Sequence, residues 1–371
     1  MSAPLDIAVA VFSQATGGGI ERDFIRLARI LAGRGHAVTL YTTAMGPIAE
    51  DYPVHLLKRR GLSNHARMAA FGSDVAAATR GRHDLVVGFQ KLPGLDVLYC
   101  GDWCVADRAI PAWKRLLPRH RALMRLERAC CGADAKTLLM MLAEPQADAY
   151  RRAWSVAPDR MVVLPPTLDR RRILAPAPDA RRQEIRTSLG IAPDRVAWFW
   201  LGLQPRIKGL DRVIEALALS PRAQLLAAGL DLTKSSVRQA LRQAERLGCA
   251  DRVTLMGRMD DVALDRLFTA CDLMVHPARL DVTGTVIVEA LGVGMPVIVT
   301  ANCGYSVHVA ASGAGVVVPA DATPAIMAEA ASASADLRRV WSAAARAYVQ
   351  HADLTTGLDV AADRIEEAGA R

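Results

Sequence analysis

Short apolar runs alternate with longer amphipathic segments along this chain of 371 residues. The first run, residues 5–12, is apolar except for Asp6, which is typical of a strand buried on both faces of a parallel sheet. Three glycines follow at positions 17–19, and residues 20–34 then show the apolar spacing of an amphipathic helix. The chain is therefore predicted to begin with a strand, a glycine-rich turn and a helix.

The same alternation continues to residue 164 and restarts near residue 196. Alternating strands and helices predict parallel sheets with right-handed crossovers, so we expect an α/β fold with two doubly wound domains. Further predicted helices lie at residues 210–219 and 235–247. The remaining predicted strands, all short and mostly apolar, lie at residues 37–41, 85–89, 137–142, 161–164, 196–201, 223–228, 253–256, 273–276, 297–300 and 315–318.

The domain boundary is expected in the proline-rich stretch 165–193. We expect an N-terminal domain over residues 1–170, a C-terminal domain over residues 171–350, and a C-terminal helix at 351–371 that packs back on the N-terminal domain. The Ala-rich stretch 337–367 is expected to be helical. Two such domains would face each other across a cleft, and ligands would bind beyond the carboxyl ends of the strands.

The composition and charge of the chain limit the kinds of function that it can have. Hydrophobic residues make up 51% of the chain and charged residues 23%, the balance of a folded soluble protein. Of the net charge of +8, most lies in residues 1–165, which hold 22 basic and 15 acidic side chains. An anionic partner is expected on this half, although a solvated surface explains the charge equally well.

The cysteines and the apolar stretches bear on the compartment. Seven cysteines without a CxxC pair favour a reducing, cytoplasmic environment. The first residues lack the basic start of a signal peptide. Residues 290–320 carry no Asp, Glu, Lys or Arg, but glycines and Pro296 break the stretch into pieces too short to span a bilayer. It is expected to form buried strands joined by turns.

The glycine-rich loop at 17–19 could hold a phosphate, because glycines let the backbone approach closely and a helix N-terminus offers free N–H groups. A dinucleotide fingerprint needs a third glycine, where this chain has Arg22, and an acid after the second strand, where residues 41–43 supply none. A nicotinamide or flavin cofactor is therefore not expected. A tight turn without a ligand is the simpler alternative.

Two further loops carry candidate binding residues. Lys208, at the end of loop 202–209, could neutralise a diphosphate, although no Walker A pattern is present and a solvated lysine is the simpler alternative. Asp281 lies in the loop after the strand at 273–276. Glu289 lies within an apolar helix, where a carboxylate needs a polar partner such as a ribose diol or a nearby backbone N–H group.

Together these loops resemble retaining glycosyltransferases of the GT-B fold, family 4, with the sequence from Glu289 to Ile298 as the most specific match. Within that family, further stretches are similar to the glucosyltransferases (glucosyltransferase I) that decorate an inner-core heptose of lipopolysaccharide. These stretches lie at residues 18–24, 87–97, 139–142, 164–166 and 276–278.

The resemblance implies a UDP-sugar donor, with UDP-glucose as the expected one, a lipid-linked core oligosaccharide as acceptor, retention of configuration, and neither a cofactor nor a metal. It implies catalytic roles for Asp102, Lys208, Arg172 and Asp281. It also implies acceptor-binding roles for Asp23, Lys91 and Asp102. The donor-binding residues that it implies are Gly18, Gly19, Arg172, Arg206, Lys208, Thr283, Gly284, Thr285 and Glu289.

Two departures from the family pattern leave alternatives open. The family has Glu where this chain has Asp281, whose side chain is shorter by one methylene. Because the carboxylate is withdrawn by this length, another donor such as a UDP-N-acetylhexosamine is an alternative. The basic residue beside Lys208 is displaced to Arg206. A nucleotide-sugar epimerase and a non-catalytic sugar-nucleotide or lipid-binding module are further alternatives.

Residues 104–131 carry seven basic and two acidic side chains interleaved with apolar ones. Such a segment suits an anionic lipid surface, which predicts a peripheral protein on the inner membrane; an ordinary packed helix is the alternative. Nucleic acid binding is not expected, because no RRM, helix-turn-helix or aromatic stacking pattern is present.

Overall fold

The computed structural model describes residues 3–14, 18–47 and 51–370. The chain divides into two compact units: unit 1 is Met1–Thr167 with Thr356–Arg371, and unit 2 is Leu168–Thr355. The sequence placed the boundary three residues later, after residue 170. Gly17 of the predicted glycine-rich loop lies outside the described residues.

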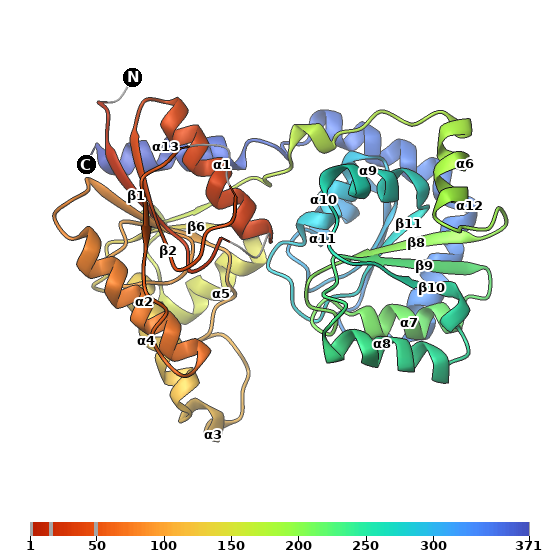
Figure 1. Ribbon diagram of the computed structural model, residues 1–371, viewed down its shortest axis with the longest axis horizontal. Coiled ribbons are helices and arrows are strands. Elements are labelled where there is room, and N and C mark those ends of the chain that lie inside the picture. Colours follow the sequence, from red (N-terminus) through yellow and green to blue (C-terminus); the bar gives the residue numbers. More distant parts are fainter. Residues whose placement is uncertain (1–2, 15–17, 48–50, 371) are drawn as a thin grey trace. The chain divides into compact units, whose positions relative to one another are not determined.

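Unit 1 contains a seven-stranded parallel sheet in the order β3-β2-β1-β4-β5-β6-β7 (Figure 1). Its strands are β1 (Asp6–Ala10), β2 (Ala37–Thr42), β3 (Val54–Leu56), β4 (Leu85–Gly88), β5 (Val97–Cys100), β6 (Leu138–Met141) and β7 (Met161–Val163). Its α-helices are α1 (Gly19–Gly33), α2 (Asn64–Thr79), α3 (Ala112–Arg115), α4 (Pro118–Cys131), α5 (Glu144–Trp154) and α13 (Gly357–Gly369).

The alternation of side chains along β1 explains the layers of unit 1. Ile7 and Val9 pack with α1 and α13 on one face of the sheet. Ala8 and Ala10 face the other way and pack with α2, α4 and α5. Successive strand residues point to opposite faces, so a sheet covered by helices on both sides needs an apolar residue at nearly every position.

Unit 2 contains a six-stranded parallel sheet in the order β10-β9-β8-β11-β12-β13. Its strands are β8 (Val196–Leu201), β9 (Ala223–Ala228), β10 (Val253–Leu255), β11 (Leu273–His276), β12 (Val297–Thr300) and β13 (Gly315–Val318). Its α-helices are α6 (Asp179–Ser188), α7 (Leu210–Ala218), α8 (Ser235–Arg246), α9 (Asp261–Ala270), α10 (Thr285–Gly292), α11 (Ser306–Ser312) and α12 (Pro324–His351).

The structure confirms the predicted α/β class with two parallel sheets. It also contains helices that the sequence analysis did not place, namely α2, α5, α6, α9 and α11. The sequence missed β3 because its three residues are exposed and form no apolar run. It missed β5, which follows β4 without an intervening helix. It also merged the C-terminal helices, whereas α12 ends at His351 and α13 begins at Gly357.

Helix α13 returns the chain to unit 1, where it packs beside α1 (Figure 1). A Cβ at Gly357 would overlap the carbonyl oxygen of Pro165, so only glycine fits at the start of this helix. The guanidinium of Arg34 pairs with Asp363 and Glu366 on α13. Among the described residues, no helix is long and apolar enough to cross a membrane.

Candidate functional site

Two loops of unit 2 that lie far apart in the sequence meet at one edge of the sheet. Strands β8 and β11 are neighbours, and the strand order reverses between them. The loop after β8 and the loop after β11 therefore emerge side by side, and the backbone N–H of Arg279 donates to the carbonyl of Ile207 at 2.8 Å. Such a reversal point is the usual ligand position in doubly wound sheets.

Glycines make this close approach possible. Gly209 has φ 75° and precedes α7, and a Cβ at this position would overlap the carbonyl oxygen of Pro277. Gly284 has φ 78° at the N-cap of α10. Other residues avoid this left-handed conformation, so both loops depend on glycine at these two places.

Lys208 forms a polar cluster with the buried Asp281 and His276 where the two loops meet. The Nζ atom of Lys208 lies 2.7 Å from Oδ2 of Asp281. The same oxygen lies 2.8 Å from Nε2 of His276, at the end of β11. The other oxygen, Oδ1, accepts from the backbone N–H of Gly284 at 3.0 Å. One carboxylate thus joins the loop after β8, the end of β11 and the N-terminus of α10.

The cluster keeps Asp281 ionised. Burial opposes the negative charge, but the hydrogen bond from His276 and the positive charge of Lys208 outweigh it. Together they hold the pKa of this carboxyl well below its usual range. The Lys208 side chain is 26% exposed, against 9% for Asp281, so the cationic member of the pair is the one that reaches solvent. A solvent-accessible cation at this edge suits an anionic ligand.

Several other residues predicted to bind the donor lie on the two loops and on α10, which meet at this cluster. Glu289 is buried on α10, as the sequence suggested, and it has a polar or charged interaction. The carbonyl oxygen of Thr283 accepts a hydrogen bond from the backbone N–H of Tyr305 at 2.7 Å. Helix α10 begins two residues later, at Thr285. The Arg206 side chain is exposed, and its carbonyl accepts from Nη1 of Arg279 at 2.6 Å.

Arg172 lies at the start of unit 2, in the short helical turn Arg170–Arg172. Its guanidinium is buried and pairs with the carboxylates of Asp261 and Asp265 on α9. Two carboxylates already neutralise this charge, and the contacts attach the segment around residue 170 to α9. We therefore leave Arg172 out of the proposed donor site.

In unit 1, Gly18 and Gly19 form the N-terminus of α1 after β1, with Gly18 at the N-cap. A Cβ at Gly101 would overlap the side chain of Ile20, so the loop after β5 packs directly against this helix start. Asp102 is the next residue of that loop, and its side chain is exposed. The structure thus brings the glycine turn and Asp102 together within unit 1.

Lys91 is placed inside unit 1 and not on its surface. Its Nζ lies 2.7 Å from Oε2 of the fully buried Glu127 and 3.1 Å from the carbonyl oxygen of Trp103. The lysine therefore holds the backbone next to Asp102. Because its ammonium is buried, it is not exposed for the direct contact with the acceptor that the sequence predicted. Sequence reasoning missed Glu127, because one acid in a basic amphipathic helix carries no sign of burial.

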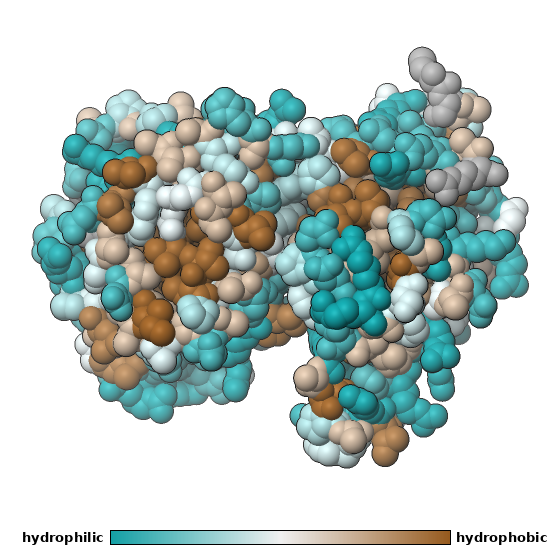
Figure 2. Space-filling view, turned by 180° about the vertical axis from the view of Figure 1, so that it is seen from behind, coloured by the Kyte–Doolittle hydropathy of each residue, from teal (hydrophilic) through white to brown (hydrophobic). Residues whose placement is uncertain are grey.

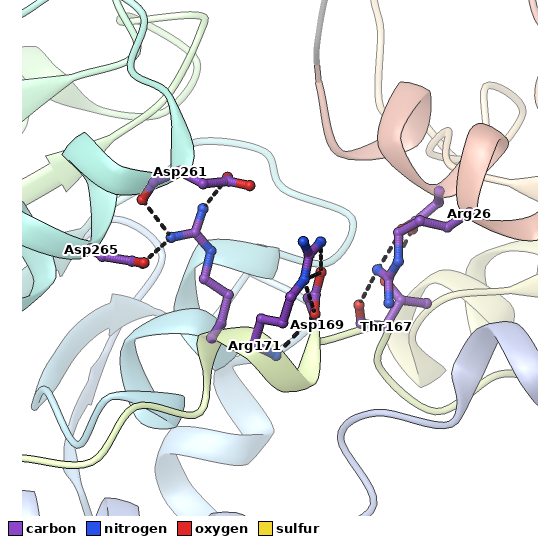
Figure 3. A network of polar contacts seen from close by, with 8 residues as sticks. Arg26, Thr167, Asp169, Arg171, Asp261 and Asp265 are labelled. Atoms are coloured by element: carbon purple, nitrogen blue, oxygen red, sulfur yellow. Dashed lines mark hydrogen bonds and ion pairs between the residues drawn. The ribbon is translucent and has the colours of Figure 1, made fainter. Parts of the chain in front are cut away.

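Asp23 is also buried. Its Oδ2 accepts from the hydroxyl of Tyr99 at 2.8 Å and from that of Thr167 at 3.0 Å. Arg26 adds a contact to Oδ1 at 3.3 Å and donates to the carbonyl of Thr167 (Figure 3). Burial raises the pKa of Asp23 in spite of these partners. This network fixes the last residues of unit 1 before the chain leaves it.

The sequence of this chain matches the family model described as glycosyl transferases group 1 over residues 181–348. It is 32% identical to the lipopolysaccharide glucosyltransferase WaaG of Escherichia coli strain K12, over 97% of this chain and 98% of that protein. The chain belongs to the group 1 glycosyltransferases. The resemblance noted from the sequence is confirmed.

Solved structures of other proteins have the same architecture. The crystal structure of WaaG, a glycosyltransferase involved in lipopolysaccharide biosynthesis, has a TM-score of 0.90 at 30% identity, covering 97% of this chain and 99% of that one. HepE of Anabaena, solved with UDP and glucose, has a TM-score of 0.77 at 19% identity, covering 97% and 99%. The GT-B fold of this glycosyltransferase is therefore confirmed.

His276 is the residue of this glycosyltransferase that sequence reasoning missed at the candidate donor site. The sequence pointed to it only as part of the His276-Pro277-Ala278 match. Within the described parts of the chain, no group of three or more His, Cys, Asp or Glu side chains is arranged to hold a metal ion. Metal-independent transfer stays a prediction.

Proposed function

We propose that this glycosyltransferase transfers glucose from UDP-glucose to an inner-core heptose of lipopolysaccharide, with retention of configuration and without a bound metal or cofactor. The observation that carries the proposal is the 32% identity, over nearly the whole of both chains, to a lipopolysaccharide glucosyltransferase. The Lys208 cluster at the reversal point of the unit 2 sheet supplies a cation at the position where such folds bind nucleotides.

The charge changes of the reaction assign roles to these residues. Breaking the bond between sugar and diphosphate leaves negative charge on the leaving phosphate, which preorganised cations and N–H groups stabilise. We assign this role to Lys208, with Glu289 binding the ribose. On the acceptor side, the exposed Asp102 would orient the attacking hydroxyl, whose proton passes to the leaving phosphate.

A donor screen tests the proposal. Purified protein is mixed with heptose-terminated core lipid and, in separate reactions, UDP-glucose, UDP-galactose or their N-acetyl forms, and products are identified by mass spectrometry. We expect a mass gain of one hexose with UDP-glucose. Transfer from a UDP-N-acetylhexosamine alone would refute the glucose assignment. A changed sugar nucleotide without acceptor would indicate an epimerase, and no conversion at all would indicate a binding module.

A lysine pair tests the donor site. Lys208→Met removes the cation at the loop junction, whereas Lys234→Met removes an exposed lysine of the same unit that pairs with Asp231. Loss of one such stabilising group commonly costs a factor of about 100 to 1,000 in kcat. We expect this loss only for Lys208→Met. Equal kcat/KM values for the two variants would remove Lys208 from the site.

We also propose that helices α3 and α4 bind an anionic membrane surface, consistent with a location at the inner membrane. α3 has no buried residue, and Trp113, Leu116 and Leu117 are 61%, 76% and 43% exposed beside basic side chains. Figure 2 shows apolar residues among hydrophilic ones at the tip of the projection that these helices form. Exposed apolar residues rimmed by cations suit a lipid interface.

Vesicle sedimentation tests this surface. Leu116→Ser should weaken binding to vesicles containing anionic lipid, while Val262→Ser, which removes a 72% exposed apolar residue of unit 2, should not. Raising the salt concentration should weaken binding of the wild-type protein, because part of the attraction is electrostatic. Binding that is absent in the wild-type protein would refute the proposal.

A further inference from the structure

We propose that Gln146 and Tyr150 are positioning residues of the glycosyl transfer, which hold the backbone of Asp102 so that its carboxylate meets the acceptor hydroxyl. The inference rests on the proposed function, since it concerns how the acceptor residue of the same reaction is held. Both side chains are 0% exposed, so neither touches the substrate and both act through Asp102.

Both residues come from α5, the helix that follows β6. Gln146 lies in the first turn of this helix and Tyr150 lies one turn later, so the two side chains share one face. Strands β5 and β6 are parallel neighbours, so the start of α5 and the loop after β5 lie at the same edge of the sheet. Asp102 belongs to that loop, which explains how a helix distant in sequence reaches it.

The amide of Gln146 connects the ends of these two strands. Its Oε1 accepts from the backbone N–H of Leu142, just after β6, at 2.8 Å. Its Nε2 donates to the carbonyl oxygen of Cys100 at 2.7 Å and to that of Asp102 at 2.9 Å. Because an amide nitrogen carries two hydrogens, both are used on the backbone of the loop after β5.

Tyr150 adds a second donor to the carbonyl of Asp102, through its hydroxyl at 3.2 Å. This carbonyl therefore faces buried donors, while the side chain of the same residue is exposed. The carboxylate of Asp102 forms no hydrogen bond with any other described residue, so its position follows from that of its backbone. Groups that act on a substrate need such support from the side chains behind them.

Other buried side chains hold the residues that follow Asp102. Lys91 donates to the carbonyl of Trp103 at 3.1 Å, and Glu127 accepts from the N–H of Val105 at 2.7 Å. These contacts remain when the contacts from α5 are removed. Loss of the α5 contacts should therefore shift Asp102 locally and leave the rest of the loop in place.

A local shift of Asp102 is sufficient to slow the reaction. Displacing a positioning group by about 1 Å can lower a rate by about 100-fold. Loss of the two hydrogen bonds from Gln146 should therefore lower kcat by about 10- to 100-fold. The Kd for UDP should stay unchanged, because the proposed donor residues Lys208 and Glu289 belong to unit 2.

The experiment compares Gln146→Met with Thr137→Val as a matched control. Thr137 is also buried, and its hydroxyl donates to the carbonyl of Leu95 at 2.8 Å, near the amino ends of β5 and β6. For each variant, kcat is measured for transfer from UDP-glucose to heptose-terminated core lipid, and the Kd for UDP is measured by isothermal titration calorimetry. We expect kcat to fall only in Gln146→Met, with wild-type UDP affinity in both variants. Equal losses of kcat, or weaker UDP binding in Gln146→Met, would overturn the inference.

A double variant tests whether Gln146 acts through Asp102. Adding Gln146→Met to Asp102→Ala should cause no further loss of kcat, because no carboxylate is left to be positioned. An equal loss in the Asp102→Ala background would overturn the inference.

Tyr150→Phe is a milder variant that deletes one oxygen and keeps the ring. It should lower kcat less than Gln146→Met does, and only while Asp102 is present. Wild-type kcat in Tyr150→Phe would overturn the role given to the tyrosine. If Gln146→Met does not fold, Tyr150→Phe decides alone, and wild-type kcat then overturns the whole inference.

The same measurements separate this inference from the proposed function. Absence of hexose transfer by the wild-type protein would refute the proposed function, and wild-type kcat in Asp102→Ala would refute the acceptor role of Asp102. A loss of kcat in Asp102→Ala together with wild-type kcat in Gln146→Met would refute the positioning role alone.

Discussion

The ion pair between Lys91 and Glu127 makes an asymmetric prediction about stability. Glu127 is completely buried and accepts four N–H groups: Lys91 and Val105 at 2.7 Å through Oε2, and Ala106 and Trp154 at 2.9 Å through Oε1. Burial opposes its charge, but Lys91 and the hydrogen bonds outweigh burial and lower the pKa of the carboxyl. The ammonium of Lys91, by contrast, donates to two oxygens among the described residues, on Glu127 and on the carbonyl of Trp103.

Removing the acid should therefore cost more than removing the lysine. In Glu127→Gln an amide NH₂ replaces one oxygen and faces two N–H donors, and the buried Lys91 loses its hydrogen-bonded counter-ion, so that the charge of Asp102 remains to oppose it. The expected loss is about 3–5 kcal/mol of unfolding free energy. In Lys91→Met the carboxylate keeps three N–H donors, and the expected loss is about 1–3 kcal/mol. The double variant should lose less unfolding free energy than the sum of the losses in the two single variants.

Hydrogen exchange of separate peptides, measured by mass spectrometry along a urea series, reports the stability of each unit. Peptides from α4 and β6 report unit 1, and peptides from β8 and β9 are an internal control that should be unaffected. A global melting curve would combine the two units and hide the effect. A loss in Lys91→Met equal to or greater than that in Glu127→Gln, or a loss below about 1 kcal/mol in Glu127→Gln, would refute the reasoning.

Two further predictions concern a loop glycine and the C-terminal helix. Gly209→Ala should lower the melting temperature and the affinity for UDP, because its Cβ would overlap the carbonyl oxygen of Pro277. Gly248→Ala is the control: Gly248 has φ 66° but no atom within 4 Å of the added Cβ, so the protein should lose only about 1 kcal/mol of unfolding free energy. Equal losses of stability in the two variants would contradict this. The hydrogen bond from His36 lowers the pKa of Glu366 in the folded protein. The ionised Glu366 therefore stabilises the fold at pH values above the unfolded pKa of about 4.3, and this stabilisation is lost as the pH falls. Between pH 3 and 7, the urea midpoint of Glu366→Gln should fall less steeply toward acid than that of the wild-type protein. Identical pH profiles of the two proteins would exclude a contribution of ionised Glu366 to stability.

Local patterns in the sequence were sufficient to predict most of the fold. Buried parallel strands need apolar residues at nearly every position, so β1, β8 and β11 stand out as short apolar runs. Patterns were insufficient where an element lacks this signature. β3 is exposed at the sheet edge, and the break between α12 and α13 lies in a stretch whose composition still favours helix.

The sequence also indicated where candidate site residues lie along the chain, but not what each side chain contacts. A position after a strand predicts that Lys208 and Asp281 lie at the carboxyl edge of a sheet. It does not predict that they pair with each other or with His276, since that depends on β8 and β11 being neighbours. Likewise, a lysine in a loop is expected in solvent, and only packing shows that Lys91 is buried against Glu127.

The sequence by itself determined the two parallel-sheet domains, the glycine turns after the strands and the membership of a glycosyltransferase family. Only the tertiary structure decided which charges are neutralised inside the protein and which reach solvent, as the contrast between Arg172 and Lys208 shows. The physical reason is that burial of an apolar face depends on near neighbours in the sequence. The partner of a buried charge, however, comes from whichever segment the strand order brings beside it.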